Sequence, residues 1–161
     1  MRRSERAMTD AAQIEAFIRQ EQIMRIAFYD HGEIYIVPLN YGYICENGEY
    51  TFYFHGAQAG RKYSLALEKP AVGFEIDGNY ALISADTACG HSAKYMSVIG
   101  TGTLQIVSDE AEIVSGLQCI MRQATGRGDW DFPAAAVSKT AVFRLDVTKM
   151  SCKARAAGKP S

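Results

Sequence analysis

The chain has 161 residues, of which 48% are hydrophobic and 22% are charged. A chain of this length suits one domain that buries about 70% of its unfolded surface, so it needs neither a disulfide framework nor a metal to fold. The formal net charge of -1 gives no electrostatic reason to expect binding to nucleic acid or to an anionic membrane. Any site for an anion must therefore be local.

The N-terminal third predicts one helix followed by a meander of strands. Asp10 resembles a helix cap, and apolar residues recur after it at helical spacing to about residue 22. Strands are expected at residues 23–29, 34–43 and 50–54. The turns between them contain glycine, and the Asn47-Gly48 dipeptide favours a tight hairpin.

The remainder predicts two more helices and three more strands. A glycine-containing loop after His55 leads into a helix that Pro70 stops. Further strands are expected at residues 72–77, 95–107 and 140–148. Gly100 and Gly102 indicate a bend or a close backbone approach within one of them. A helix begins near Asp109 and ends at Gly126.

These strands predict a mainly β protein, a six-stranded antiparallel β-barrel with peripheral helices. The strands and helices do not alternate regularly, which argues against a dinucleotide-binding fold. Residues 1–150 are expected to form a single domain. Residues 151–161 combine basic residues with Ala, Gly and Pro, a composition typical of a flexible C-terminal tail.

The sequence also favours a cytoplasmic protein. No apolar run reaches the length of about 18 residues that a membrane-spanning helix requires. Arg2-Arg3 is followed by charged residues where an export signal has an apolar segment. The 4 cysteines show no C-x-x-C spacing, which fits reduced thiols. Cys89 and His91 offer only weak evidence for a metal or haem site, so no metal is expected.

The segment from His55 to Lys62 carries the strongest signal for chemistry. A strand end, two glycines and the adjacent Arg61-Lys62 pair at a helix start are the ingredients of a phosphate site. The loop is shorter than a Walker A loop and lacks its Ser or Thr, which argues against nucleotide hydrolysis. The alternative interpretation is a solvated basic helix start.

Pro38 gives a second signal because proline cannot donate to a central β-ladder. The segment Pro38-Leu39-Asn40-Tyr41 would present main-chain groups, an amide and a ring to a flat heterocycle, as in a planar cofactor. The alternative interpretation is an edge strand with a bulge at Pro38.

An ordered set of short motifs resembles the FMN-binding split-barrel family of pyridoxamine 5'-phosphate oxidase-like proteins, most closely its nitroimidazole-resistance-related branch. The resemblance covers nearly the whole chain. Its motifs are residues 1–3, 25–27, 37–43, 53–56, 60–62, 74–77, Cys89 and residues 95–100. Two positions depart from the family pattern, since Gly56 stands where Ser is frequent and Met96 where Arg is frequent.

The resemblance implies a split-barrel homodimer with FMN at the subunit interface. It assigns cofactor binding to Pro38, Leu39, Asn40, Tyr41, His55, Gly56, Arg61, Lys62 and Ser97. The implied function is an FMN-dependent oxidoreductase, with nitroreductase-like activity among the candidates, that acts on a small organic molecule. His55 and Tyr41 are the polar groups expected beside that substrate. The alternative is a flavin- or haem-binding split-barrel protein without turnover.

Overall fold

The computed structural model describes residues 4–155, which contain seven strands and four α-helices. The strands are β1 (Met24–Asp30), β2 (Glu33–Leu39), β3 (Gly42–Glu46), β4 (Glu49–Ala57), β5 (Ala71–Ile83), β6 (Ser92–Ile106) and β7 (Thr140–Arg155). The helices are α1 (Ala11–Gln20), α2 (Arg61–Ala66), α3 (Glu110–Thr125) and α4 (Ala134–Val137), with 3-10 turns at Ser4–Arg6 and Ala88–Gly90.

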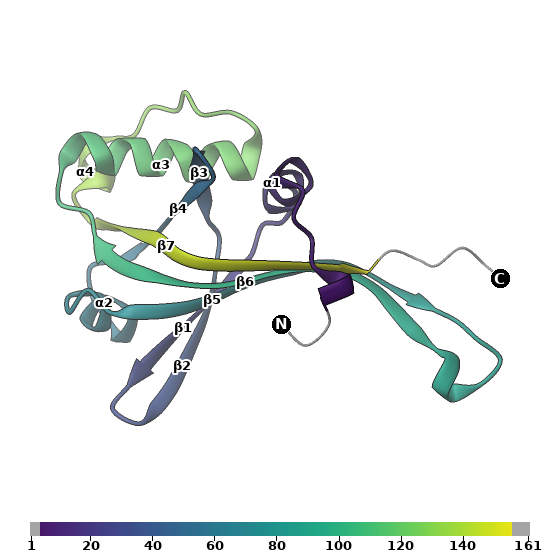
Figure 1. The fold of residues 1–161 in the computed structure, drawn as a ribbon. Coiled ribbons are helices and arrows are strands. Elements are labelled where there is room, and N and C mark those ends of the chain that lie inside the picture. The colour runs from purple at the N-terminus through teal and green to yellow at the C-terminus, as the bar shows by residue number, and fades with distance from the viewer. Residues whose placement is uncertain (1–3, 156–161) are drawn as a thin grey trace.

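All seven strands form one antiparallel sheet in the order β2-β1-β5-β6-β7-β4-β3 (Figure 1). The two edge strands, β2 and β3, are consecutive in the chain and are joined only by Asn40 and Tyr41. Because so short a connection holds both edges together at one end, the sheet curls into a barrel that is split between them. The prediction of a mainly β antiparallel barrel with peripheral helices is confirmed.

The strand count is seven because the predicted strand at 34–43 is two strands. The chain leaves β2 after Leu39 and turns so that the Tyr41 ring enters the core. The first residue of β3, Gly42, lies directly against the main chain of Cys119 and Ile120 in α3, where any side chain would collide. Burial of Tyr41 and the close approach of α3 therefore separate two segments that read as one strand in the sequence.

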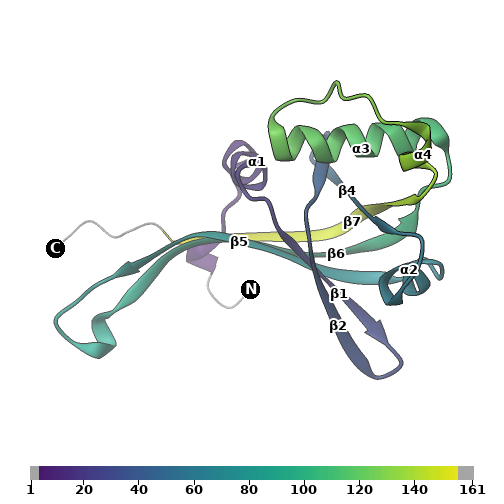
Figure 2. The same cartoon turned by 180° about the vertical axis from the view of Figure 1, so that it is seen from behind.

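Two hydrophobic clusters hold the fold together. The inward faces of the strands surround a core that includes Phe52, Phe74 and Phe143, and α1 adds Ile14 and Phe17 to it. The second cluster lies on the outer side of the sheet, where α3 covers β3, β4 and the first part of β7 (Figure 2). The helix α3 thus shields these strands on the outer side of the barrel.

The helix ends follow the sequence signals. Asp10 and Asp109 accept hydrogen bonds from the main-chain N–H groups of Gln13 and Glu112, as helix caps do. Gly126 ends α3 in a left-handed conformation with φ 76°. The sequence predictions for these helix boundaries are confirmed.

The predicted bend at the glycines of β6 is also confirmed. Side chains on Gly100 and Gly102 would collide with the main-chain oxygens of Lys149 and Asp146 on β7. The pairing register between the two strands shifts between Thr101 and Gly102. These glycines therefore let β6 and β7 approach closely where the ladder is irregular.

The C-terminal strand corrects the predicted domain boundary. Residues 151–155, which the sequence analysis assigns to a tail, continue β7 and pair with residues 95–99 of β6. The main-chain groups of β6 are available for pairing here, and this pairing outweighs the loop-like composition of the segment. Residues 156–161 lie outside the described residues. Between residues 78 and 92, β5 and β6 extend as an arm away from the barrel (Figure 1). Within the described part of the chain, no helix has the length and apolar character needed to cross a membrane.

Candidate functional site

Lys62 is a partly buried cation in the first turn of α2. Its Nζ donates to the main-chain oxygen of His55 at 3.2 Å and lies 4.8 Å and 5.5 Å from the ring centroids of Phe143 and Phe54. It forms no ion pair with any residue from 4 to 155, and burial lowers the pKa of its ammonium group. A desolvated cation without a carboxylate partner favours binding of an anion.

Gly56 provides the space that Lys62 occupies. A Cβ at Gly56 would lie 2.7 Å from the Lys62 Nζ and 3.5 Å from the Phe143 ring. Any side chain at this position would therefore displace the ammonium group. The absence of a side chain at Gly56 thus permits the observed position of the Lys62 ammonium group.

Arg61 has a different environment although it is the adjacent residue. Its Nε donates to Asp30 Oδ2 at 2.6 Å and its Nη2 donates to Glu33 Oε2 at 2.9 Å. The guanidinium carbon also lies 4.7 Å from the centroid of the Tyr35 ring. Because two carboxylates at the β1–β2 turn already balance its charge, Arg61 braces that hairpin against α2. The two residues of the predicted Arg61-Lys62 pair therefore differ: Arg61 forms ion pairs that hold the hairpin, and Lys62 forms none within residues 4–155.

The second predicted segment begins on the free edge of the sheet. Pro38 pairs with Arg25 in a ladder without register shifts, and β2 has no strand on its other side. The interpretation of Pro38 as part of an edge strand is confirmed. The bulge that was predicted at Pro38 is absent from the ladder between β1 and β2. The outer edge of β2, which ends in Leu39, leaves main-chain N–H and C=O groups unpaired by other strands. Asn40 ties the following turn by donating from Nδ2 to the main-chain oxygen of Gln22 at 3.1 Å.

Tyr41 is not available to a substrate, so that prediction is wrong. Its side chain is 1% exposed, and its hydroxyl donates to the main-chain oxygen of Ile18 at 2.7 Å. Burial raises the pKa of Tyr41 above its ordinary value. The residue fixes α1 to the barrel because a buried hydroxyl needs a partner.

The His55 side chain points away from Lys62. Successive strand residues face opposite sides, so the ring lies on the other face of β4 from Gly56 and only the main-chain oxygen of His55 meets the ammonium group. The ring borders a hollow of about 190 Å³ lined also by Leu117 of α3 and Val137 of α4. The His55 side chain is exposed, but desolvation by the surrounding protein, together with the charge of Lys62, lowers its pKa. The lowered pKa favours the neutral form of the ring.

Ser97 lies far from Lys62 within one chain. Lys62 contacts Phe143, which pairs with Ile106 at the far end of β6. Residues 97 and 106 are separated by about 30 Å along a strand, at about 3.3 Å per residue. One subunit therefore does not bring Ser97 and Lys62 to the same small ligand, although both are predicted to bind the cofactor.

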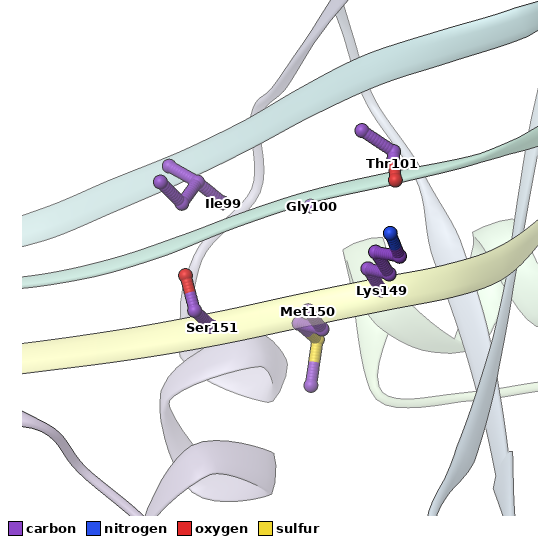
Figure 3. A pocket seen from close by; sticks show the side chains of 6 residues that line it. All are labelled: Ile99, Gly100, Thr101, Lys149, Met150 and Ser151. Atoms are coloured by element: carbon purple, nitrogen blue, oxygen red, sulfur yellow. The ribbon is translucent and has the colours of Figure 1, made fainter. Parts of the chain in front are cut away.

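A hollow of about 280 Å³ on the outer side of β6 and β7 is absent from the sequence predictions. Figure 3 shows that Ile99, Thr101, Lys149 and Ser151 point to one side of these strands, whereas Met150 points to the other. The sequence signal for this hollow was the alternation of polar and apolar residues in both strands, with no amphipathic helix nearby to cover their outward side chains.

The comparisons with known proteins agree with the fold. The pyridoxamine 5'-phosphate oxidase family model matches residues 10–154. No curated protein sequence matches the chain.

Three similar solved structures come from different bacteria. A protein described as a 5-nitroimidazole antibiotic resistance protein, from Bacteroides thetaiotaomicron, is 26% identical, with 91% of this chain and 85% of that chain covered and a TM-score of 0.77. The flavocytochrome Anf3 from Azotobacter vinelandii is 24% identical, with coverages of 100% and 74% and a TM-score of 0.81. An FAD and haem binding protein from Mycobacterium smegmatis is 16% identical, with coverages of 97% and 76% and a TM-score of 0.77. Because the family model spans nearly the whole chain, the protein belongs to the pyridoxamine 5'-phosphate oxidase family.

Proposed function

We propose that the protein is a flavoprotein that binds FMN, with the phosphate at Lys62 and the ring along the free edge of β2. The observation that carries this proposal is the partly buried Lys62 ammonium group, which has no acidic partner among residues 4–155. A phosphate would supply the missing negative charge in a site where solvent screening is weak. The family and the flavin-binding relatives support the choice of a flavin.

Each residue of this site has a separate task in the proposal. Lys62 binds the phosphate, and Gly56 keeps the space for its ammonium group open. Arg61 holds the β1–β2 hairpin against α2, which fixes the distance between Lys62 and the edge of β2. The unpaired main-chain groups of β2 near Pro38 orient the polar edge of the ring.

The activity that we propose is reduction of a small organic molecule. A bound flavin supplies hydride chemistry, and the protein positions the ring and excludes water from one side of it. Similarity to the Bacteroides thetaiotaomicron protein makes a nitroimidazole the first substrate class to assay. Tyr41 is buried and His55 faces another hollow, so neither side chain enters this proposal as a proton donor.

The test is the cofactor content of the freshly purified protein. We expect a flavin absorption spectrum, and we expect heat denaturation to release FMN, identified by its mass. Titration of protein stripped of flavin should then show tighter binding of FMN than of riboflavin, because only FMN carries the phosphate. A colourless protein that fails to bind added FMN would refute the proposal.

A second candidate function, haem binding, is favoured by the position of His55. Its ring has a lowered pKa, and neutral imidazole is a common ligand of haem iron. Two structural relatives are described as a flavocytochrome and as an FAD and haem binding protein. The hollow beside His55, about 190 Å³, is smaller than the roughly 300 Å³ of the smallest typical ligand sites, so haem would require α4 to move. A haem absorption band that His55→Ala abolishes would establish this function.

A further inference from the structure

A cleft of about 540 Å³ lies between α1, β3 and the C-terminal half of α3, and the flavin proposal makes no use of it. Figures 1 and 2 show α1 and α3 at the same end of the barrel, beside β3. Gln123 of α3 ties the two helices together, because its Nε2 donates to the main-chain oxygens of Ile18 and Glu21, each at 2.8 Å. The volume of the cleft falls within the range of about 300–1,000 Å³ that is typical of sites for small molecules.

One wall of the cleft is a polar cluster on α1 and β3. Glu15 Oε1 accepts hydrogen bonds from Arg19 Nη2 at 2.7 Å and from the Tyr43 hydroxyl at 3.3 Å. The Glu15 carboxylate therefore balances the charge of Arg19. This wall adds no net charge, so the charge of the cleft depends on its other wall.

The other wall carries Arg122 of α3, which forms no ion pair with any residue from 4 to 155. Gly128 leaves room for its guanidinium group, since a Cβ at Gly128 would lie 2.7 Å from Arg122 Nε and 2.8 Å from its Nη2. The side chains that line the cleft thus include two guanidinium groups and one carboxylate, which leaves one positive charge. This balance favours a ligand with a single negative charge.

The free edge of β3 forms the floor between these walls, because β3 pairs only with β4. Glu46 and Glu49 flank a two-residue turn and form the hydrogen-bonded pair that closes the hairpin. Hydrogen-bonded and non-hydrogen-bonded pairs alternate along an antiparallel ladder, so Cys45 directs its N–H and C=O away from β4. Tyr43 has the same orientation, and its main-chain oxygen accepts a hydrogen bond from Cys119 Sγ at 3.1 Å.

Cys45 therefore presents one main-chain donor and one main-chain acceptor to the cleft. No main-chain group of residues 4–155 outside β4 forms a hydrogen bond with it. An extended ligand pairs with such a residue as an added strand does, by donating from an amide N–H and accepting at an adjacent oxygen. The floor thus selects for an amide, and Arg122 selects for an anion.

We propose that this cleft binds a small molecule with one carboxylate next to a secondary amide, the chemistry of an N-acylated amino acid. The amide N–H of the ligand donates to the main-chain oxygen of Cys45. The carboxylate accepts from the main-chain N–H of Cys45 and from the Arg122 guanidinium, and it neutralises the one unbalanced charge. A carboxylate without the amide would leave the Cys45 oxygen unpaired, and an amide without the carboxylate would leave Arg122 unpaired.

This site is independent of the proposed flavin site. No residue that lines the cleft belongs to α2, β2 or β4, the elements on which flavin binding is proposed. Binding of the acylated amino acid and binding of FMN can therefore be measured separately on the same full-length protein.

The first test uses N-acetyl-L-leucine and its neutral analogue N-acetyl-L-leucinamide as probes, each titrated into the protein and followed in amide NMR spectra. We expect N-acetyl-L-leucine to bind, with the largest shift changes at the Cys45 N–H and the Arg122 Nε–H. The neutral probe should bind at least about 10-fold more weakly, the effect of one charge-assisted hydrogen bond. Absence of binding, shift changes centred away from Cys45, or equal affinities for the two probes would overturn the proposal.

The second test separates the charge from the strand edge. Arg122→Met should weaken binding of N-acetyl-L-leucine about 10-fold or more and leave binding of the neutral probe unchanged. The matched control is Arg127→Met, which removes a nearby charge that Asp129 already balances and should alter neither affinity. Cys45→Pro removes the outward N–H at a position where an edge strand tolerates proline, so it should weaken both probes, whereas Cys45→Ala should weaken neither.

Circular dichroism and FMN titration show whether each variant keeps its fold and its flavin site. If folded Arg122→Met kept the preference for the carboxylate, or if folded Cys45→Pro bound both probes as Cys45→Ala does, the assignment of the ligand to this cleft would be wrong.

Discussion

Replacement of Lys62 by methionine distinguishes the contribution of the FMN phosphate to binding affinity from the contribution of the flavin ring. Methionine keeps an apolar stem against Phe54 and Phe143 but removes the ammonium group. A charge-assisted hydrogen bond contributes about 1.5–3 kcal/mol, so Lys62→Met should weaken FMN binding by about 10- to 150-fold. Riboflavin has no phosphate, so its affinity should not change.

The same substitution should stabilise the protein without flavin. Burial lowers the pKa of Lys62 below its ordinary value of 10.5, which means that the folded state disfavours the ammonium form. The penalty is fully present at pH 7, and it is relieved only as the pH rises through the folded-state pKa towards 10.5. Methionine removes the penalty at every pH, so the Tm of the flavin-free variant at pH 7 should exceed that of the parent.

The assay is fluorescence titration of both flavins into flavin-free parent protein, Lys62→Met and Arg61→Met. The arginine variant is the matched control, because it removes an adjacent positive charge that Asp30 and Glu33 already balance. It should alter FMN and riboflavin binding to the same extent. If Lys62→Met weakened both flavins equally, or if Arg61→Met alone removed the preference for FMN, the phosphate would not be bound at Lys62.

Three further predictions concern the stability of the fold and the ionisation of His55. Gln123 donates hydrogen bonds to three main-chain oxygens at the end of α1. Gln123→Leu should therefore lower the free energy of unfolding by about 1–3 kcal/mol in urea titrations. An unchanged urea midpoint would show that these hydrogen bonds do not stabilise the fold. Gly42→Ala forces a methyl group against the main chain of α3, so we expect the free energy of unfolding to fall by about 3 kcal/mol or more in the same measurement. A fall below about 1 kcal/mol, on the order of ordinary surface substitutions, would show that α3 shifts freely. The pKa of His55 is lowered, so its NMR titration midpoint should lie below 6.5, and the free energy of unfolding should fall as the pH drops from about 6.5 through that midpoint. A midpoint above 6.5 would show that desolvation and the charge of Lys62 do not act on this ring.

The sequence was sufficient for the local features of the fold. Alternation and turn residues predict the strands of the barrel, and Asp10, Asp109 and Gly126 mark helix ends that the structure confirms. The break between β2 and β3 was missed because it depends on tertiary contacts. Tyr41 reaches α1 and Gly42 meets α3, and neither partner is identifiable from the residues near position 40.

The candidate site was predictable only as a segment. Arg61 and Lys62 have the same charge and adjacent positions, so the sequence treats them alike. Their separation comes from Asp30 and Glu33, which lie about 30 residues earlier and reach Arg61 only after the β1–β2 hairpin has folded against α2. Long-range pairing of this kind has no local signature, and it decides which of the two cations remains available.

The unpaired Lys62 cation indicates that the site is incomplete without a ligand. Within residues 4–155, Lys62 is desolvated without an acidic partner, a destabilising arrangement for the folded chain alone. Selection for stability alone would remove such a cation, since methionine at position 62 is a simple substitution. The unpaired cation is best explained when an anionic ligand completes the site.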